Sequence, residues 1–337
     1  MTQKSLDAKL ARIHADPKDA RDFILADAKD ADMAMGIQAP GLAWDGERDR
    51  PRSLADYREQ MREVTRQELV DILLMSASSH DLLGVEQCLF DSSPVTVAVR
   101  ANDTTDIHLA RGGCYPQVPS MPFRSATLEQ LQCGRVNCSD EQRQRGCNLG
   151  LYSVTFNNHP EADLRTLEAY RNFRIEAEQK GFRHFLEVFD PNVQGAIEPE
   201  KVGDFVNDQI VRLLAAVPRS GRPLFLKIAY HGPRCMEELA SYDPHLVPGI
   251  LGGAAGTTHD AFHLLADARK HGARAALFGR KINRAEHQLT FIKFLRSVAD
   301  REIDPREAVA AYHGELQKLK IRPRLRLEQD LELTQRL

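Results

Sequence analysis

The chain lacks the features that would favour a membrane, a nucleic acid or a secretory route. None of its apolar runs approaches the roughly 20 residues that span a bilayer, and the N-terminal segment MTQKSLDAKLARIHADPKDARD is too charged for a signal peptide. Positive charge is not in excess, since 45 Lys and Arg residues face 48 Asp and Glu residues for a formal net charge of −3. Binding to a phosphate backbone usually needs a basic surface. We therefore expect a cytoplasmic protein that binds neither a membrane nor a nucleic acid.

The six cysteines are few for a chain of 337 residues, and no two of them form a CxxC pair. This pattern excludes a dense disulfide framework, and free thiols are expected. Cys133, Cys138 and Cys147 share a polar segment, which leaves a metal site as an alternative, but their spacing does not match the common zinc modules. We expect no metal and no cofactor.

What the sequence does contain is a series of short apolar runs, each followed by polar or glycine residues and then by a helical pattern. This alternation indicates βαβ units around a parallel sheet, whose strands are buried on both faces. Eight such units close into an α/β fold, the (β/α)8 TIM barrel, in which a chain of this length forms one domain, here residues 1–337. The predicted strands are residues 23–26, 70–75, 95–99, 149–156, 185–189, 224–228, 247–251 and 275–278.

Segments outside the strands are predicted to be mainly helical. Residues 5–13 and 305–337 form N-terminal and C-terminal helical extensions, which cover the barrel base or pack against another subunit. In residues 107–146 the apolar residues follow neither the helical nor the strand period clearly, and we expect an elaborated loop with room for a short helix. The predicted outer helices are residues 53–66, 162–180, 199–216, 258–270 and 286–299.

Lys227 interrupts the apolar run LFLKIAY near the carboxyl end of the sixth predicted strand. Lysine is rarely buried, and this end of a barrel strand is where catalytic groups lie. An amine must be unprotonated to attack a carbonyl, and desolvation favours the neutral form. Lys227 is therefore a candidate Schiff-base nucleophile. The alternative is a lysine that reaches the surface or pairs with a buried carboxylate such as Glu187.

Two glycine turns follow the seventh and eighth predicted strands, where TIM barrels commonly bind phosphate. Gly252 and Gly253 form the first turn, and Gly279 and Arg280 form the second. Glycine lets backbone amides approach phosphate oxygens closely, and an arginine adds a charged donor. A phosphorylated small molecule is the expected ligand. The alternative is a pair of ordinary turns, with Arg280 bound to a neighbouring carboxylate.

The segments FLKIAYHG and PGILGGAAGTTHDAFHLLADARKHGARAALFGRKINR resemble class I aldolases of the archaeal fructose-bisphosphate aldolase and deoxyribose-phosphate aldolase-like type. The resemblance covers roughly the last third of the chain, and the rest only by strand order. It implies that Lys227 forms the Schiff base and that Gly252, Gly253, Gly279 and Arg280 bind substrate phosphate. It also implies a homo-oligomer.

At the first strand the resemblance implies a catalytic aspartate at Asp27, with weaker support from FILADAKDADM. The family's Asp-His-Gly is replaced here by Asp27, Ala28 and Lys29. Lys29, with Asp30 and Asp32, either contributes to the site or belongs to a solvated loop.

At the fifth strand the family's acid/base tyrosine has no match in FLEVFDPN, where Glu187 and Asp190 are the available groups. If Glu187 points inward, it either transfers protons beside Lys227 or only pairs with it.

The sequence thus predicts a metal-independent class I aldolase that cleaves or forms a C–C bond of a phosphorylated keto-sugar. Lys227 is the nucleophile, and Asp27 or Glu187 is the acid/base. Two alternatives stay open: a phosphosugar isomerase or epimerase on the same barrel, and a non-catalytic phosphosugar-binding protein.

Overall fold

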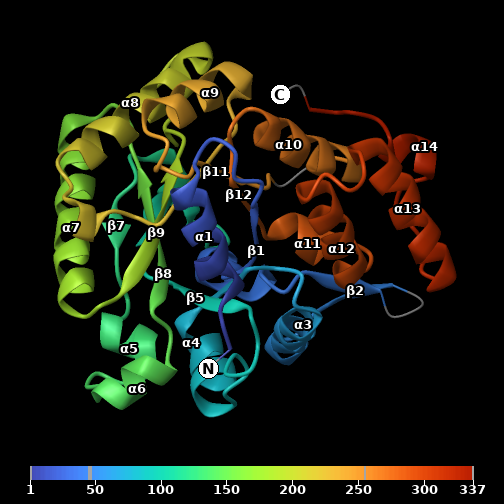
Figure 1. The fold of residues 1–337 in the computed structure, drawn as a ribbon, viewed down its shortest axis with the longest axis horizontal. Helices are drawn as coiled ribbons and strands as arrows, with labels where there is room; N and C mark the ends of the chain where they lie inside the picture. The colour runs from blue at the N-terminus through green and yellow to red at the C-terminus, as the bar shows by residue number, and fades with distance from the viewer. Residues whose placement is uncertain (1, 45–47, 254–255, 336–337) are drawn as a thin grey trace.

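A closed barrel of eight parallel strands forms the centre of the protein (Figure 1). The computed structural model describes residues 2–44, 48–253 and 256–335. Each barrel strand pairs in parallel with two neighbours, so the predicted TIM barrel is confirmed. In order around the barrel, the strands are β1 (Ile24–Lys29), β12 (Ala275–Phe278), β11 (Gly249–Leu251), β10 (Leu226–Ile228), β9 (Arg183–Phe189), β8 (Leu149–Thr155), β5 (Thr96–Arg100) and β4 (Ile72–Met75).

All eight predicted runs overlap a barrel strand, most of them with bounds that differ by one or two residues, and the largest difference is at the end of the first strand. β1 does not end at Ala26 but continues to Lys29, and every residue in it is buried. Asp27 and Lys29 pair with each other inside the protein. In the sequence, these two charged residues indicated that the strand had ended, because charged residues rarely lie in a buried strand unless they are paired.

The helices between the strands form a layer around the barrel. A capping box starts α10: Thr257 Oγ1 accepts a hydrogen bond from the Asp260 amide, and the Asp260 carboxylate accepts one from the Thr257 amide. No helix within the described part of the chain has the length and apolar character needed to cross a bilayer. The helices of this layer are α3 (Leu54–Gln67), α4 (Ala77–His80), α7 (Pro160–Gln179), α8 (Val202–Ala215), α9 (Gly232–Tyr242), α10 (Thr258–Lys270), α11 (Arg280–Arg284) and α12 (Gln288–Ala299).

The elaborated loop at residues 107–146 holds more structure than expected. It contains two short helices, α5 (Leu128–Cys133) and α6 (Asp140–Arg145), and the strand β7 (Pro122–Phe123), which pairs with β6 (Asp103–Thr104). The turn after α5 brings Cys133 and Cys138 together as a disulfide, with their α carbons 6.2 Å apart. The expectation of free thiols is therefore wrong for this pair.

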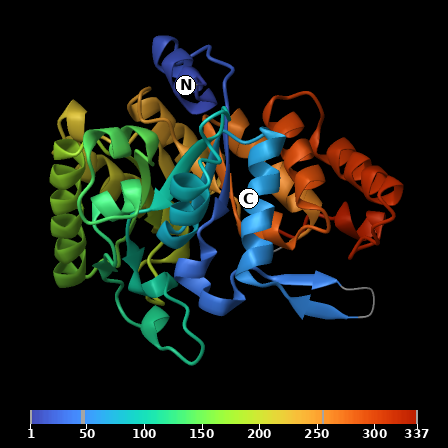
Figure 2. The ribbon, with the colours of Figure 1, turned by 90° about the horizontal axis from the view of Figure 1, so that it is seen from below.

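The two chain termini add helices outside the barrel. Helix α1 (Ser5–Ala15) covers the base, where Leu6, Leu10 and Ile13 pack against the apolar barrel interior. Figure 2 shows α1 at one end of the barrel and the hairpin of β2 (Leu42–Trp44) and β3 (Asp49–Pro51) projecting at the opposite end. The C-terminal extension is only partly helical, with α13 (Pro305–Lys318) and α14 (Leu327–Asp330) separated by a non-helical segment.

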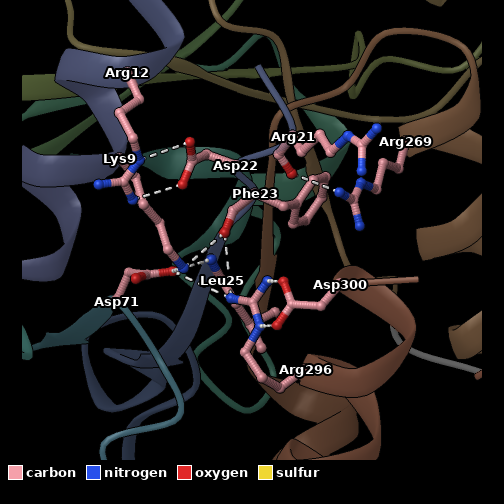
Figure 3. Close-up of polar contacts among 10 residues, drawn as sticks. All are labelled: Lys9, Arg12, Arg21, Asp22, Phe23, Leu25, Asp71, Arg269, Arg296 and Asp300. Atoms are coloured by element: carbon pink, nitrogen blue, oxygen red, sulfur yellow. Dashed lines mark hydrogen bonds and ion pairs between the residues drawn. The ribbon is translucent and has the colours of Figure 1, made fainter. Parts of the chain in front are cut away.

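Asp71, which precedes β4, ties three elements together at the barrel base (Figure 3). Its Oδ2 atom accepts hydrogen bonds from Lys9 Nζ of α1 at 2.8 Å, from the Leu25 amide of β1 at 2.9 Å and from Arg296 Nη1 of α12 at 3.3 Å. Arg296 also binds Asp300 through two hydrogen bonds at the surface. This network holds the covering helix on the barrel at the end opposite the hairpin.

We expect Asp71→Ala to lower the free energy of unfolding by about 3 kcal/mol, because it leaves buried donors without their acceptor. Urea unfolding measures the loss. The matched control is Asp300→Ala, which removes the more exposed carboxylate on the same Arg296 and should cost less than about 1 kcal/mol. Equal losses in the two variants would contradict this view of the base.

Candidate functional site

Four charged side chains lie inside the barrel mouth, above the apolar layer that fills its interior. Alternation along a strand turns every second residue inward. On β1 the inward residues Ile24, Ala26 and Ala28 join the interior cluster, and the next position of that phase is Asp30. The four are Asp30, Arg100, Glu187 and Lys227, none of them more than 7% exposed.

Lys227 and Glu187 face each other across neighbouring strands. They are paired in the register of β10 and β9, and Lys227 Nζ lies 2.6 Å from Glu187 Oε1. Ser153, in register with Glu187 on β8, donates its hydroxyl to Glu187 Oε2 at 2.6 Å. The structure thus places the amine and the carboxylate in direct contact, which is the pairing considered from the sequence as the alternative to a nucleophilic Lys227.

Arg100, which the sequence did not single out, joins the two carboxylates of the mouth. Its Nε donates to Asp30 Oδ2 at 2.6 Å, and its Nη2 lies 3.5 Å from Glu187 Oε2. Burial alone would raise the pKa of Asp30, but Arg100 and then Lys227 hold that pKa below its usual value. Two cations and two carboxylates therefore balance one another, and Asp30 is ionised at neutral pH.

A cavity of about 180 Å³ opens onto these charges. Part of its wall is apolar and comes from Ile107 and Leu109 at the start of the elaborated loop. The Leu109 amide donates to the Ala34 carbonyl at 2.7 Å, which fixes this loop on α2 (Ala31–Met35). Besides the four charged residues, the cavity is lined by the predicted Gly252, Gly253, Gly279 and Arg280.

The first glycine turn meets two different steric needs. A Cβ atom on Gly252 would lie 2.1 Å from Phe278 Cδ1, so only glycine packs there. The Gly252 amide already donates to the Leu277 carbonyl at 2.8 Å, which leaves it engaged within the barrel. Gly253 has a φ of +62°, a left-handed conformation that glycine adopts without strain. Of this pair, Gly253 is the one whose amide can turn toward a ligand.

The second glycine turn lies close against β1. A Cβ atom on Gly279 would lie 2.7 Å from the Ala28 carbonyl oxygen, and the turn leads directly into α11. Lys281 Nζ donates to the Gly256 carbonyl at 2.6 Å, so a side chain of α11 ties the second turn to the loop that follows the first. Arg280 lines the cavity and is exposed.

Asp27 and Lys29 are not brought into the cavity. Both are wholly buried on the outward face of β1, where Lys29 Nζ lies 3.0 Å from Asp27 Oδ2 and donates a hydrogen bond to Asn283 of α11. Burial raises the pKa of Asp27 and lowers that of Lys29. The physical reason is that side chains along a strand alternate between its two faces, and Asp27 and Lys29 lie between the inward-facing residues. On β1 it is Asp30 that reaches the mouth.

The other acidic residues considered near strand ends also lie outside the cavity. Asp32 accepts a hydrogen bond from Ser76 Oγ at 2.6 Å, and Asp190 Oδ1 lies 2.8 Å from His231 Nε2. Among the residues that the structure describes, no group of three or more His, Cys, Asp or Glu side chains is arranged to hold a metal ion.

Comparison with known proteins shows that the fold of this chain is similar to that of several solved structures. No family model matches the chain, and no curated protein matches its sequence. A Schiff-base-forming fructose-1,6-bisphosphate aldolase, solved with reaction intermediates, matches with a TM-score of 0.61 and 14% identity over 88% of this chain and all of its own. The fructose-bisphosphate aldolase of Slackia heliotrinireducens gives 0.64 and 14% identity over 92% of this chain and 91% of its own. An archaeal aldolase with its catalytic lysine bound to the carbinolamine intermediate gives 0.59 and 15% identity over 88% and 100%. The chain shares the barrel of these aldolases.

Asp103 at the rim gives a pH-dependent prediction. Burial raises the pKa of Asp103 to about 6. Because the ordinary value is about 3.9, the folded protein holds this proton more tightly than the unfolded chain, so the contribution of Asp103 to stability falls from about pH 4 to about pH 6. Asp103→Asn should therefore gain stability relative to the wild type across this window, by at most about 3 kcal/mol, and then level off. Urea unfolding at several pH values measures the difference, and a gain that shrinks as the pH rises would refute the shift.

Proposed function

We propose that this protein is a class I aldolase that cleaves or forms a C–C bond of a phosphorylated keto compound through a Schiff base on Lys227. The observation that carries the proposal is a buried amine, 2.6 Å from a carboxylate, in a cavity that also contains two glycine turns. A phosphate held at those turns would place the attached carbonyl carbon near the amine, which converts an encounter into an intramolecular step. The shared barrel of the Schiff-base aldolases supports the same conclusion.

Lys227 and Glu187 would carry out the formation of the iminium. The Lys227 ammonium first passes a proton to Glu187, and the resulting neutral amine attacks the carbonyl carbon while Glu187 protonates the carbonyl oxygen. The nitrogen then loses a proton to Glu187, which gives the neutral carbinolamine. Glu187 returns that proton to the carbinolamine hydroxyl, which leaves as water and gives the iminium. Ser153 holds Glu187 in the orientation that these transfers need.

Asp30 would be the second base, in the place first expected for Asp27. It removes the proton from the hydroxyl on the carbon beyond the bond that breaks. The electrons of the C–C bond pass into the iminium and give an enamine, and that hydroxyl carbon leaves as a carbonyl. Protonation of the enamine and hydrolysis then free Lys227. Arg100 suits Asp30 to this role because it keeps the carboxylate ionised.

The phosphate would be held by Gly253, Gly279 and Arg280, while Gly252 provides space for the close packing of the turn. The partner is then a phosphorylated small molecule, and all the proposed steps use protein side chains. A cytoplasmic location and a homo-oligomer remain predictions from the sequence.

Reductive trapping tests the proposal directly. With borohydride and a panel of phosphorylated ketoses, we expect a reduced adduct whose mass maps to the peptide that contains Lys227. Lys227→Met should form no adduct and should lose turnover by at least a factor of about 1,000, because nucleophilic catalysis needs the amine. A Lys227→Arg variant that keeps most of its activity would instead indicate an isomerase or epimerase.

Paired amide substitutions on β1 separate the two aspartates. Asp30→Asn should lower kcat by about 100-fold or more, because it removes a base from the cavity. Asp27→Asn should leave kcat within a few-fold but cost about 3 kcal/mol of stability, because it removes the partner of a buried lysine. Steady-state kinetics and urea unfolding on both variants give the answer, and the reverse pattern would restore the original assignment to Asp27.

A further inference from the structure

A second and larger cavity, of about 660 Å³, adjoins the reaction cavity. The two cavities share three lining residues, Ala31, Met35 and Arg280. Ala31 and Met35 belong to α2 and Arg280 to the second glycine turn, so the cavities meet between these two elements, and Lys227 does not line the outer cavity. A group in this outer cavity would therefore lie beyond the phosphate, on the side away from the reacting carbonyl.

Positive charge dominates the wall of the outer cavity. Arg111 comes from the elaborated loop, Arg284 ends α11, and Arg324 lies in the C-terminal segment before α14. With Arg280, four guanidinium groups from segments far apart in the sequence surround one space. Among the described lining residues, Asp49 supplies the one carboxylate.

Within the described part of the chain, two of these cations, Arg111 and Arg324, lack the charge pairing seen in the reaction cavity. The guanidinium groups of Arg111 and Arg324 form no hydrogen bond or ion pair with the described residues, in contrast to that of Arg100. After burial, the charge of Arg284 is the next cause that lowers the pKa of Arg280, as expected for like charges held near each other. An anion in the cavity would relieve this repulsion.

The surrounding backbone is already tied in place. The Arg324 amide donates to Glu286 Oε1 at 2.8 Å, and Arg52 Nη1 donates to the Asn283 carbonyl at 3.2 Å. The wall also includes exposed apolar side chains, Ile37 and Leu42, which suit the organic part of a ligand. The cavity therefore combines an apolar wall with four arginines, of which Arg111 and Arg324 form no ion pair with the described residues.

We propose that the outer cavity binds a phosphate-bearing polyanion through Arg111, Arg280, Arg284 and Arg324. This anion has two possible sources. It is either a part of the substrate attached beyond the phosphate at the glycine turns, such as a diphosphate-linked group, or a separate anion that binds beside the substrate. Only the first source rests on the proposed aldolase function.

Calorimetric titration with inorganic diphosphate tests the binding site itself. The wild type should bind it with an affinity that falls as salt is added, and the double variant Arg111→Gln, Arg324→Gln should bind at least about 10-fold more weakly. Arg212→Gln, an exposed arginine on α8 across the barrel from the hairpin (Figure 1), is the matched control and should bind as the wild type does. Absence of binding, or equal affinity in the wild type and the double variant, would overturn the proposal.

Kinetics then distinguish the two sources. If the outer cavity holds part of the substrate, the double variant should raise KM at least about 10-fold for a ketose diphosphate and leave KM for the ketose monophosphate unchanged. If the anion is separate, diphosphate should bind without preventing borohydride trapping of the monophosphate at Lys227. Diphosphate binding that depends on Arg111 and Arg324, in a protein that traps no carbonyl compound, would refute the aldolase and keep the outer site.

Discussion

The ion pair between Lys227 and Glu187 is the interaction on which the barrel mouth depends. A buried amine or carboxylate alone is costly, and removal of one partner from a buried pair typically costs about 3–5 kcal/mol. Arg100 extends the pair to Asp30, so that two positive and two negative side chains share one water-poor space. This pairing lowers the cost of burying the charges. It also places an amine and two carboxylates on one cavity, and these are the groups that the proposed Schiff-base chemistry needs.

The stabilising network around Asp71 and the candidate functional site are located at opposite ends of this barrel. At the base, Asp71 joins α1, β1 and α12, and the apolar face of α1 closes the interior. At the mouth, the glycine turns approach β1 and Phe278 so closely that a side chain would not fit at Gly252 or Gly279. The buried Lys29 donates a hydrogen bond to Asn283 and so fixes α11 against β1, just behind the second glycine turn.

The sequence was sufficient to predict the barrel and part of the site, for physical reasons. Strands buried on both faces read as continuous apolar runs, and Lys227 stood out because a charge within such a run is unusual. The glycine turns were visible because a side chain does not fit at Gly252 or Gly279 and because Gly253 has a positive φ, so glycine is needed at these positions. Arg100 was missed because it follows Val99 at the point where the apolar run ends, although it is the last residue of β5.

The assignment on β1 and the disulfide show where such reasoning stops. Ala26 and Ala28 mark the inward phase that leads to Asp30, but a paired Asp27 and Lys29 made the outward phase look like a polar strand end. The contact between Cys133 and Cys138 depends on how the loop folds on the helices around it, which no local pattern reveals.

The most direct measurement of the central claim is a crystal structure of the protein reduced with borohydride in the presence of a phosphorylated ketose. We predict continuous electron density from Lys227 Nζ into the ligand, with the phosphate at the amide of Gly253 and at the turn of Gly279 and Arg280. An adduct on another lysine, or a phosphate bound away from both turns, would contradict it.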